Sequence, residues 1–382
     1  MRIATLNTWG LPEPFSRKPG ARLDAIAGRL AALEVDAIAF QEVWTPSARA
    51  RLGRAGRDAG LEHVWHKHAS LGGRIGASGL LVLSRFPVES VRFDRFGLPE
   101  RATQVDYFGG KGLVRLRLAT PAGPVVLVDT HLQAHQGYSP LRTGQMVQLA
   151  VALHRVRDPV IALGDFNCDD SDPEYRVLIG LTGLRDVAVA LDRREPTLLR
   201  SNPFRADRGS DHRIDLVLTR DGRDRRVVPR SVRRIFDETF LLDGELASYS
   251  DHAGLRAELE IEAGPGAPLP TPGADIVQLA RDLLEEGCKE AEGRRRQRLA
   301  WAGAGVAGAT AVAVGERVGH PLTRRQFLRA GLQGAALLGL ASSSVFSLLA
   351  ELFEPSEIRA FRHLSSDLAR LARAPQSRVE PR

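Results

Sequence analysis

Short apolar segments dominate the first 263 residues, and several of them end on a polar side chain. Only two longer stretches, residues 21–33 and 142–156, carry apolar residues at helical spacing. Many strands with few helices between them favour two packed β-sheets with helices on their outer faces, an α+β architecture. The expected strands are residues 2–7, 37–43, 79–85, 112–119, 125–132, 160–166, 213–219 and 253–261.

A Pro/Gly-rich stretch follows these segments and divides the chain. Residues 264–274, GPGAPLPTPGA, cannot sustain a helix or an inner strand. We therefore expect an N-terminal domain at 1–263, this linker, and a helical tail at 275–382. The only two cysteines, Cys168 and Cys288, lie far apart and predict neither a disulfide framework nor a metal site.

Two uncharged stretches lie in the tail. Residues 299–315 carry no charged side chain over 17 residues, and residues 330–350 carry none over 21. A membrane-spanning helix needs about 20 apolar residues, so the second stretch is long enough and the first is short. Both are rich in Gly, Ala and Ser, which lets membrane helices pack closely. We favour a membrane-inserted helical hairpin, with a soluble helical hairpin as the alternative.

The charges around these stretches bear on which side of a membrane the N-terminal domain would occupy. Five Lys and Arg lie at 289–298, before the first stretch, and four lie at 317–329, between the two. This count slightly favours a cytoplasmic N-terminal domain. Residues 323–328, TRRQFL, resemble a twin-arginine export motif, and export through it is the alternative.

Asp165 and Asn167 raise the main question about function. They follow the apolar run 160–163, and residues two apart in a strand face the same way. Such a pair either forms an Asx turn at the end of the strand or presents an acceptor and a donor together at the rim of a sheet. The chain has only three asparagines, Asn7, Asn167 and Asn202, which favours a chemical role for each.

Further strand ends carry polar side chains of the same kind. Glu42 and His131 each follow an apolar run, and Asp251 and His252 precede the last expected strand. Asp215 lies inside an apolar strand, where an unpaired carboxylate is costly. A neighbouring histidine is the usual partner, because the carboxylate orients the ring and stabilises its cationic form. This oxygen-rich set suits Mg²⁺ rather than zinc.

Six motifs carrying these residues occur in one order along the chain: LNTWG, QEVW, DTHL, GDFN, RIDLVL and SDH. This order resembles the endonuclease/exonuclease/phosphatase superfamily, whose fold is that of DNase I. The resemblance covers about residues 1–262. It implies a four-layer α/β/β/α sandwich and a metal-dependent phosphoric diester hydrolase.

The resemblance also implies a metal site and a general base. Glu42 would be the main Mg²⁺ ligand, with Asn7 and Asp251 beside it, and Mn²⁺ is a possible substitute. His252 would activate the attacking water, paired with Asp215.

Three more residues would act on water and phosphate. Asp165 would position the water, and His131 and Asn167 would hold phosphate oxygens as charge develops. The tripeptide SDH occurs twice, at 210–212 and 250–252. The family pattern places the base in the second copy, so we expect His212 to be a loop residue.

Within the superfamily, the sequence looks most similar to neutral sphingomyelinases. LNTWGLP and THLQAH are similar to segments of that family, and residues 106–112, DYFGGKG, resemble a loop in which Asp106 and Lys111 take matching positions. That pair is associated in the family with switching on the active site. For Lys111 the alternative is a solvated lysine at a hairpin turn. The resemblance implies a phospholipase C that acts on phospholipid head groups, with the membrane as partner through the tail.

Two other functions stay open. A nuclease of the same superfamily is one, but residues 1–263 contain 37 Lys and Arg against 34 Asp and Glu, a net charge of +3. Such a balance gives little support for a surface that binds nucleic acid. A non-catalytic, membrane-tethered interaction protein is the other. It would gain nothing from so many costly polar strand ends.

Overall fold

The computed structural model describes residues 1–67, 78–98, 110–134, 137–205, 209–318 and 326–373. The chain forms two compact units, Met1–Ala280 together with Asp367–Arg382, and Arg281–Ser366. Asp106 lies outside the described residues, as do residues 323–325 of the twin-arginine-like stretch.

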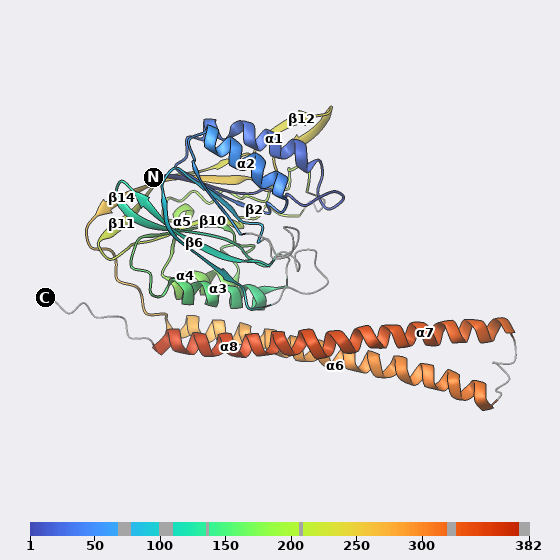
Figure 1. Cartoon of the computed structure of the whole chain (residues 1–382). Coiled ribbons are helices and arrows are strands. Elements are labelled where there is room, and N and C mark those ends of the chain that lie inside the picture. Colours follow the sequence, from blue (N-terminus) through green and yellow to red (C-terminus); the bar gives the residue numbers. More distant parts are fainter. Residues whose placement is uncertain (68–77, 99–109, 135–136, 206–208, 319–325, 374–382) are drawn as a thin grey trace. The chain divides into compact units, whose positions relative to one another are not determined.

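Two six-stranded sheets form the frame of the N-terminal unit (Figure 1). Pairs β1–β2 and β7–β8 are parallel, and the other neighbouring strands are antiparallel. The first sheet has the order β11 (Arg225–Ile235), β14 (Gly254–Ala263), β1 (Arg2–Asn7), β2 (Ala37–Gln41), β4 (Leu81–Ser84) and β3 (His63–His66). The second has the order β5 (Val88–Arg95), β6 (Gly112–Thr120), β7 (Gly123–His131), β8 (Val160–Asp165), β10 (Asp215–Arg220) and β9 (Arg185–Asp186).

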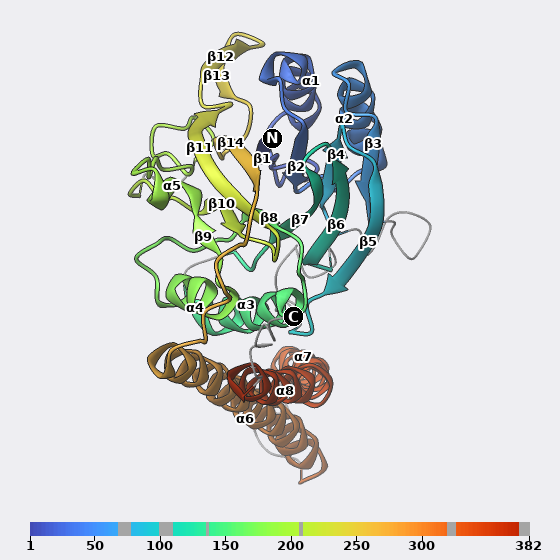
Figure 2. The ribbon, with the colours of Figure 1, turned by 90° about the vertical axis from the view of Figure 1, so that its left-hand side faces the viewer.

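Helices cover the outer face of each sheet (Figures 1 and 2). Apolar residues of α1 (Pro19–Arg29) and α2 (Pro46–Asp58) pack on the first sheet, and those of α3 (Ser139–Leu153) and α4 (Pro173–Thr182) pack on the second. Each of these helices has a proline in its first turn, where the missing N–H group costs no hydrogen bond. Mixed sheets flanked by helices agree with the expected α+β class. The unit also contains the short helices η1 (Ala31–Leu33) and α5 (Val187–Ala190) and the hairpin β12 (Thr239–Leu242)–β13 (Glu245–Ser248).

The core between the two sheets explains where the polar residues gather. Successive side chains of a strand alternate between its faces, so Ile161, Leu163 and Asp165 of β8 share one face. Ile161 and Leu163 belong to the buried cluster that fills the space between the sheets, and Asp165 comes next in the row. The other central strands follow the same pattern. An apolar core therefore gives way to a polar layer at one end of the sheets.

The two long strands β5 and β11 are among those that were not expected from the sequence. Both lie at sheet edges, and both carry several charged residues at exposed positions. An edge strand with one solvated face needs few apolar residues, so the pattern that marks inner strands is weak there.

The boundary between the units falls at Ala280, inside helix α6 (Ala274–Val318). The linker and the first turn of α6 pack closely on the N-terminal unit. A Cβ atom added at Gly180 would lie 2.8 Å from the Ile276 side chain, and one at Gly183 would lie 2.9 Å from Pro270. These contacts hold the first turn of α6 with the first unit.

The second unit consists of the rest of α6 and a second long helical segment. That segment runs through α7 (Gln326–Leu348), the π-helical turn η4 (Leu349–Phe353) and the start of α8 (Glu354–Arg373). Within the described residues, one helix, Ala330–Arg373, is long and apolar enough to cross a membrane by length and composition, with a mean hydropathy of 1.7 over its most apolar 18-residue window. Residues 299–315 are helical but do not form a second candidate there.

Candidate active site

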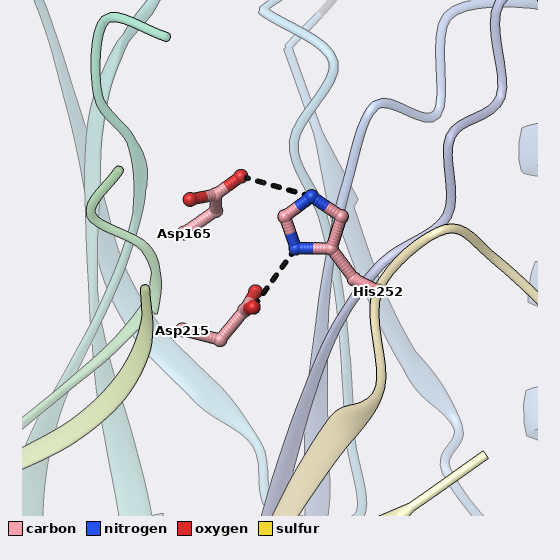
Figure 3. Close-up of side chains that lie close together, drawn as sticks. All are labelled: Asp165, Asp215 and His252. Carbon is pink, nitrogen blue, oxygen red and sulfur yellow. Dashed lines mark hydrogen bonds and ion pairs between the residues drawn. The ribbon is translucent and has the colours of Figure 1, made fainter. Parts of the chain in front are cut away.

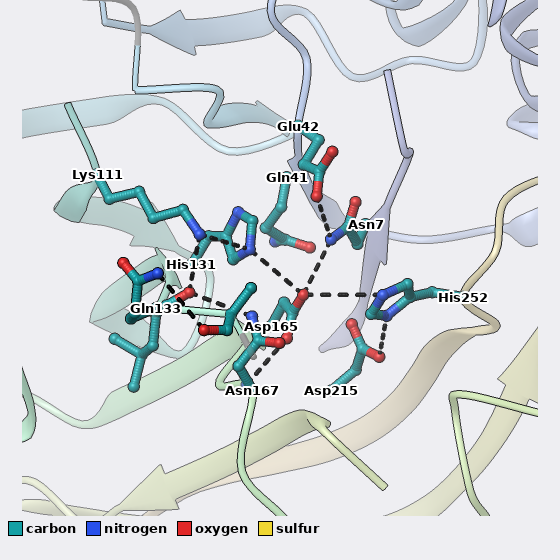
Figure 4. Close-up of polar contacts among 12 residues, drawn as sticks. Asn7, Gln41, Glu42, Lys111, His131, Gln133, Asp165, Asn167, Asp215 and His252 are labelled. Carbon is teal, nitrogen blue, oxygen red and sulfur yellow. Dashed lines mark hydrogen bonds and ion pairs between the residues drawn. The ribbon is translucent and has the colours of Figure 1, made fainter. Parts of the chain in front are cut away.

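Five polar side chains meet at one end of the space between the sheets (Figure 4). They are Asn7, Gln41, His131, Asp165 and Asp215, the terminal residues of their strands. Register explains why they meet, because Asp165 pairs with His131 of β7 on one side and with Asp215 of β10 on the other. All five are buried, so their polar atoms need hydrogen-bond partners from the protein, from water or from a ligand.

His252 lies between two buried carboxylates (Figure 3). Its Nδ1 is 2.9 Å from Asp215 Oδ2, and its Nε2 is 4.0 Å from Asp165 Oδ2. Burial lowers the pKa of His252, but the charges of Asp215, Asp251 and Asp165 outweigh it and raise the pKa well above the ordinary value. The ring is therefore held in one orientation by Asp215 and is made a stronger base.

The two oxygens of Asp165 have different partners. Its Oδ1 accepts the backbone N–H of Asn167 at 2.9 Å, which is an Asx turn, and Asn167 has the left-handed φ of 50° that asparagine tolerates. Its Oδ2 accepts the amide of Asn7 at 2.9 Å and faces both histidines of the site. The Asx turn and the contacts with Asn7 and the two histidines thus occur together in one side chain. Burial and the charge of Asp215 raise the pKa of Asp165 to about 6.

Glu42 joins this site through Asn7. The Asn7 amide Nδ2 donates to Glu42 Oε1 at 3.1 Å as well as to Asp165, while its Oδ1 accepts the backbone N–H of Trp9. Glu42 has a left-handed φ of 59°, so the chain turns sharply after β2. The turn brings the Glu42 carbonyl oxygen to within 2.3 Å of where a Cβ of Gly10 would lie, so this position requires glycine.

Asp251 lies beside the same site, in the loop before β14. Ser250 Oγ lies 3.2 Å from Asp251 Oδ1 and 2.6 Å from the backbone oxygen of Asn7. The loop that carries Asp251 and His252 is therefore held against the end of β1.

Lys111 joins the site through a contact with His131. Lys111 is almost fully buried, and its Nζ lies 3.2 Å from His131 Nε2 and 3.0 Å from the backbone oxygen of Leu132. The Asn167 side chain donates to the same oxygen at 3.1 Å. Burial, together with the charges of Lys111 and His252, lowers the pKa of His131 well below its ordinary value. Lys111 is therefore part of the site and not a solvated turn residue.

A second polar layer beneath the site was missed in the sequence. Gln41 Nε2 donates to Asp129 Oδ1 at 2.7 Å, and Gln41 also bonds Thr5. Burial raises the pKa of Asp129 well above the ordinary value. A carboxylate inside the apolar run 125–132 was the available signal, and it is the same signal that identified Asp215.

The other copy of the SDH tripeptide, at 210–212, makes contacts of its own. His212 Nε2 lies 3.0 Å from Ser210 Oγ, and its Nδ1 lies 3.6 Å from Asp169. These contacts place His212 in a loop pairing, as expected from the motif order.

The donor set fits a hard divalent cation. Asp165, Asp215 and His252 each offer a ligand atom within 4.8 Å of one another, and Asn7 bridges Glu42 to Asp165. The Oδ1 of Asp215 is buried without a hydrogen-bond partner. Burial and the charge of Asp215 disfavour the charged form of Asp165, and a cation bound nearby would favour it.

Sequence relatives match part of this chain. A candidate neutral sphingomyelinase of Drosophila melanogaster is 29% identical over 278 residues, which cover 68% of this chain and 61% of the fly protein. An inositol phosphosphingolipids phospholipase C of Schizosaccharomyces pombe is 28% identical over 190 residues, which cover 47% of this chain and 43% of the yeast protein. The matched part is thus less than two thirds of the length of either relative.

Solved structures show the same fold at lower identity. D. rerio TDP2 in complex with a single-strand DNA product has a TM-score of 0.56 at 21% identity, covering 68% of this chain and 98% of that chain. A beta toxin variant from Staphylococcus aureus with bound magnesium ions has a TM-score of 0.53 at 16% identity, covering 67% of this chain and 98% of that chain. The fold is therefore DNase I-like. The Endonuclease/Exonuclease/phosphatase family matches residues 4–252, and the chain belongs to that family.

Proposed function

We propose that the protein is a Mg²⁺-dependent phosphodiester hydrolase of the phospholipase C type, which cleaves phospholipid head groups in the manner of a neutral sphingomyelinase. The observation that carries this proposal is the placement of His252 between Asp215 and Asp165. Family membership supports hydrolysis of a phosphate ester. The names of the relatives support a sphingolipid or related lipid as the substrate.

His252 acts as the general base. Because Asp215 binds Nδ1, Nε2 is the nitrogen that faces the site and takes the proton of the attacking water. Asp215 stabilises the imidazolium that forms. The 4.0 Å separation between Nε2 and Asp165 Oδ2 is too long for a direct hydrogen bond and leaves Asp165 able to orient that water.

Glu42, Asn7 and Asp251 would hold the metal ion, with Mn²⁺ as a possible substitute for Mg²⁺. Carboxylate and amide oxygens are the ligands that Mg²⁺ prefers. When bound, the cation would neutralise the phosphate and stabilise the leaving oxygen. Glu42 and Asn7 are tied by a hydrogen bond, and Asp251 is held to the backbone of Asn7 through Ser250.

His131, Asn167 and Lys111 face the phosphate in this proposal. Lys111 lies against His131, so its ammonium group adds positive charge where the phosphate oxygens gain negative charge in the transition state. A switch that pairs Lys111 with Asp106 stays a proposal from the sequence resemblance.

The helical unit would attach the enzyme to its lipid substrate. Its two uncharged stretches, 299–315 and 330–350, expose large apolar side chains, among them Trp301, Leu337 and Leu338, which is costly in water and favourable in lipid. Outside these stretches the two helices are instead joined by ion pairs such as Arg294–Glu357 and Arg295–Glu351. We place the bilayer at the two uncharged stretches and the catalytic unit on the cytoplasmic side, with export through residues 323–328 as the alternative.

One experiment decides between lipid and nucleic acid. The full-length protein is assayed with Mg²⁺ for release of phosphocholine from sphingomyelin micelles, for release of inositol phosphate from inositol phosphosphingolipids, and for nicking of plasmid DNA. We expect head-group release, lost with His252→Ala and with chelation of the metal. Plasmid nicking without head-group release would make the protein a nuclease. Absence of all three activities would contradict the proposed hydrolase.

A further inference from the structure

Arg22 is a buried cation that the reaction proposed above does not use. It lies on α1, and none of its surface is exposed to solvent. Its Nε donates to the Arg17 oxygen, one Nη to the oxygens of Thr8 and Tyr249, and the other Nη to the oxygen of Trp9. A guanidinium that bonds only backbone oxygens fixes the course of the chain rather than the position of another side chain.

The backbone that Arg22 binds belongs to the two loops of the site. Thr8 and Trp9 directly follow Asn7, and Tyr249 lies just before Asp251 and His252. These loops are more than 230 residues apart in the sequence, and Arg22 holds both through one Nη, at 2.8 Å from the Thr8 oxygen and 3.0 Å from the Tyr249 oxygen.

Two further features hold the first loop in place. Trp9 has a left-handed φ of 47°, a costly conformation for an aromatic residue. Its ring lies 4.9 Å from the Arg22 guanidinium and 5.4 Å from the ring of Phe204, which is itself 5.6 Å from Arg22. The cation therefore stabilises the strained turn that sets the direction of Asn7.

We propose that Arg22 is a positioning residue that preorganises the metal site, by holding the loop after Asn7 and the loop before Asp251 and His252 at a fixed separation. This inference rests on the proposed function, because it assigns Asn7 and Asp251 to the metal. Ser250 joins the same two loops through its single hydrogen bond to the Asn7 oxygen and supplies a second link.

A different role for Arg22 predicts the opposite effect on the metal. Glu42 and Asp251 act on the charge of Arg22, so its guanidinium could serve only as a counter-charge for the metal-free site. Removal of a mere counter-charge would strengthen binding of a cation, because a repulsive positive charge is lost. Removal of a positioning residue weakens binding. Arg22→Lys separates the roles, since lysine keeps the charge but loses the planar fork of donors.

Arg220 offers a matched control. It is also a buried arginine, and it donates to three backbone oxygens, those of Leu153, Val156 and Thr182. Burial lowers the pKa of both Arg22 and Arg220 to about 10. Arg220 ends β10 at the end opposite Asp215, away from the site.

The test compares Arg22→Lys, Arg22→Met, Ser250→Ala and Arg220→Met in the full-length protein. Calorimetry measures Mn²⁺ affinity, and hydrogen exchange of the metal-free protein measures protection of segments 5–11 and 248–253. We expect both Arg22 variants to bind Mn²⁺ about 10- to 100-fold more weakly and to exchange faster in both segments. Ser250→Ala gives a smaller change of the same kind, and it keeps the test decisive if Arg22→Met fails to fold. Arg220→Met lowers the melting temperature without either effect.

Two results would overturn the inference. In one, the Arg22 variants lose thermal stability as Arg220→Met does but keep Mn²⁺ affinity and protection of the two segments. In the other, Arg22→Met binds Mn²⁺ more tightly, as a counter-charge predicts. If the wild-type protein binds no metal, the proposed function fails, and exchange of the two segments still decides the role of Arg22.

Discussion

His252 Nδ1 lies 2.9 Å from Asp215 Oδ2, and both groups are buried at the end of the sheets. The two residues are 37 positions apart. Asp215 begins β10 of the second sheet and His252 lies in the loop before β14 of the first sheet, so their contact depends on how the sheets face each other. This contact orients the ring and leaves Nε2 facing Asp165.

Substitution of His252 tests the base. We expect His252→Ala to lower kcat by ~10²–10⁴-fold, the usual contribution of a general base, and Asp215→Asn to lower it as well by leaving the ring unoriented. His212→Ala is the matched control, because His212 lies in the other SDH tripeptide and pairs with Ser210. Loss of activity in His212→Ala with retention in His252→Ala would reverse the assignment.

Glu42 is expected to dominate metal affinity. Glu42→Gln keeps the size of the side chain but removes a charge, and Mg²⁺ affinity should fall by at least about tenfold. Glu34→Gln, which removes a carboxylate on the exposed surface, should leave the affinity unchanged. Titration calorimetry measures both. An unaltered affinity in Glu42→Gln would remove Glu42 from the metal site.

The buried carboxyl of Asp129 predicts a pH dependence of stability. Its pKa in the folded state is raised above that in the unfolded chain, so the folded state binds more protons and the free energy of unfolding falls as pH rises through the raised pKa. Asn does not titrate. We expect Asp129→Asn to gain stability relative to wild type as pH increases above about 4. Urea unfolding of the chelated proteins at several pH values measures the difference, and a constant difference would contradict the expectation.

Lys111 is predicted to keep His131 neutral. Removal of its charge in Lys111→Met should raise the pKa of His131, because Nζ lies 3.2 Å from Nε2. The imidazole signals of the metal-free protein, followed by NMR across pH, report this change. We also expect kcat to fall about 10²-fold, as for the loss of one donor to a developing oxyanion. Lys67→Met is the control, since Lys67 lies over Phe93.

The exposed leucines of α7 test attachment to lipid. Leu337 and Leu338 are 68% and 70% exposed, and an arginine in the middle of a bilayer costs roughly 3 kcal/mol. Leu337→Arg/Leu338→Arg should abolish flotation with vesicles while hydrolysis of a soluble phosphodiester is retained. Val91→Arg places the same charge at an exposed apolar position of β5 and should leave flotation intact. Equal flotation of all three proteins would contradict membrane insertion.

Much of the site could be predicted because its signal is local. Asp165 at the end of an apolar run and Asp215 inside another were identifiable from their neighbours. Asn167 does not follow strand alternation, because β8 ends at Asp165 and Asn167 lies in the Asx turn with a left-handed φ. Arg22 gave a signal that was not used. It precedes Ile26 and Leu30 at intervals of four residues, on the buried face of an amphipathic helix, where a charged residue needs buried partners.

The sequence by itself determined the α+β class, the polar strand ends and the order of the motifs, because strand alternation, helical spacing and turn chemistry act over a few residues. Only the tertiary structure decided that Lys111 lies against His131, that Asn7 links Glu42 to Asp165, and that Arg22 joins two loops. These contacts depend on strand register and on the packing of one sheet against the other. Both are set by the burial of the whole apolar core, which no short stretch of sequence specifies.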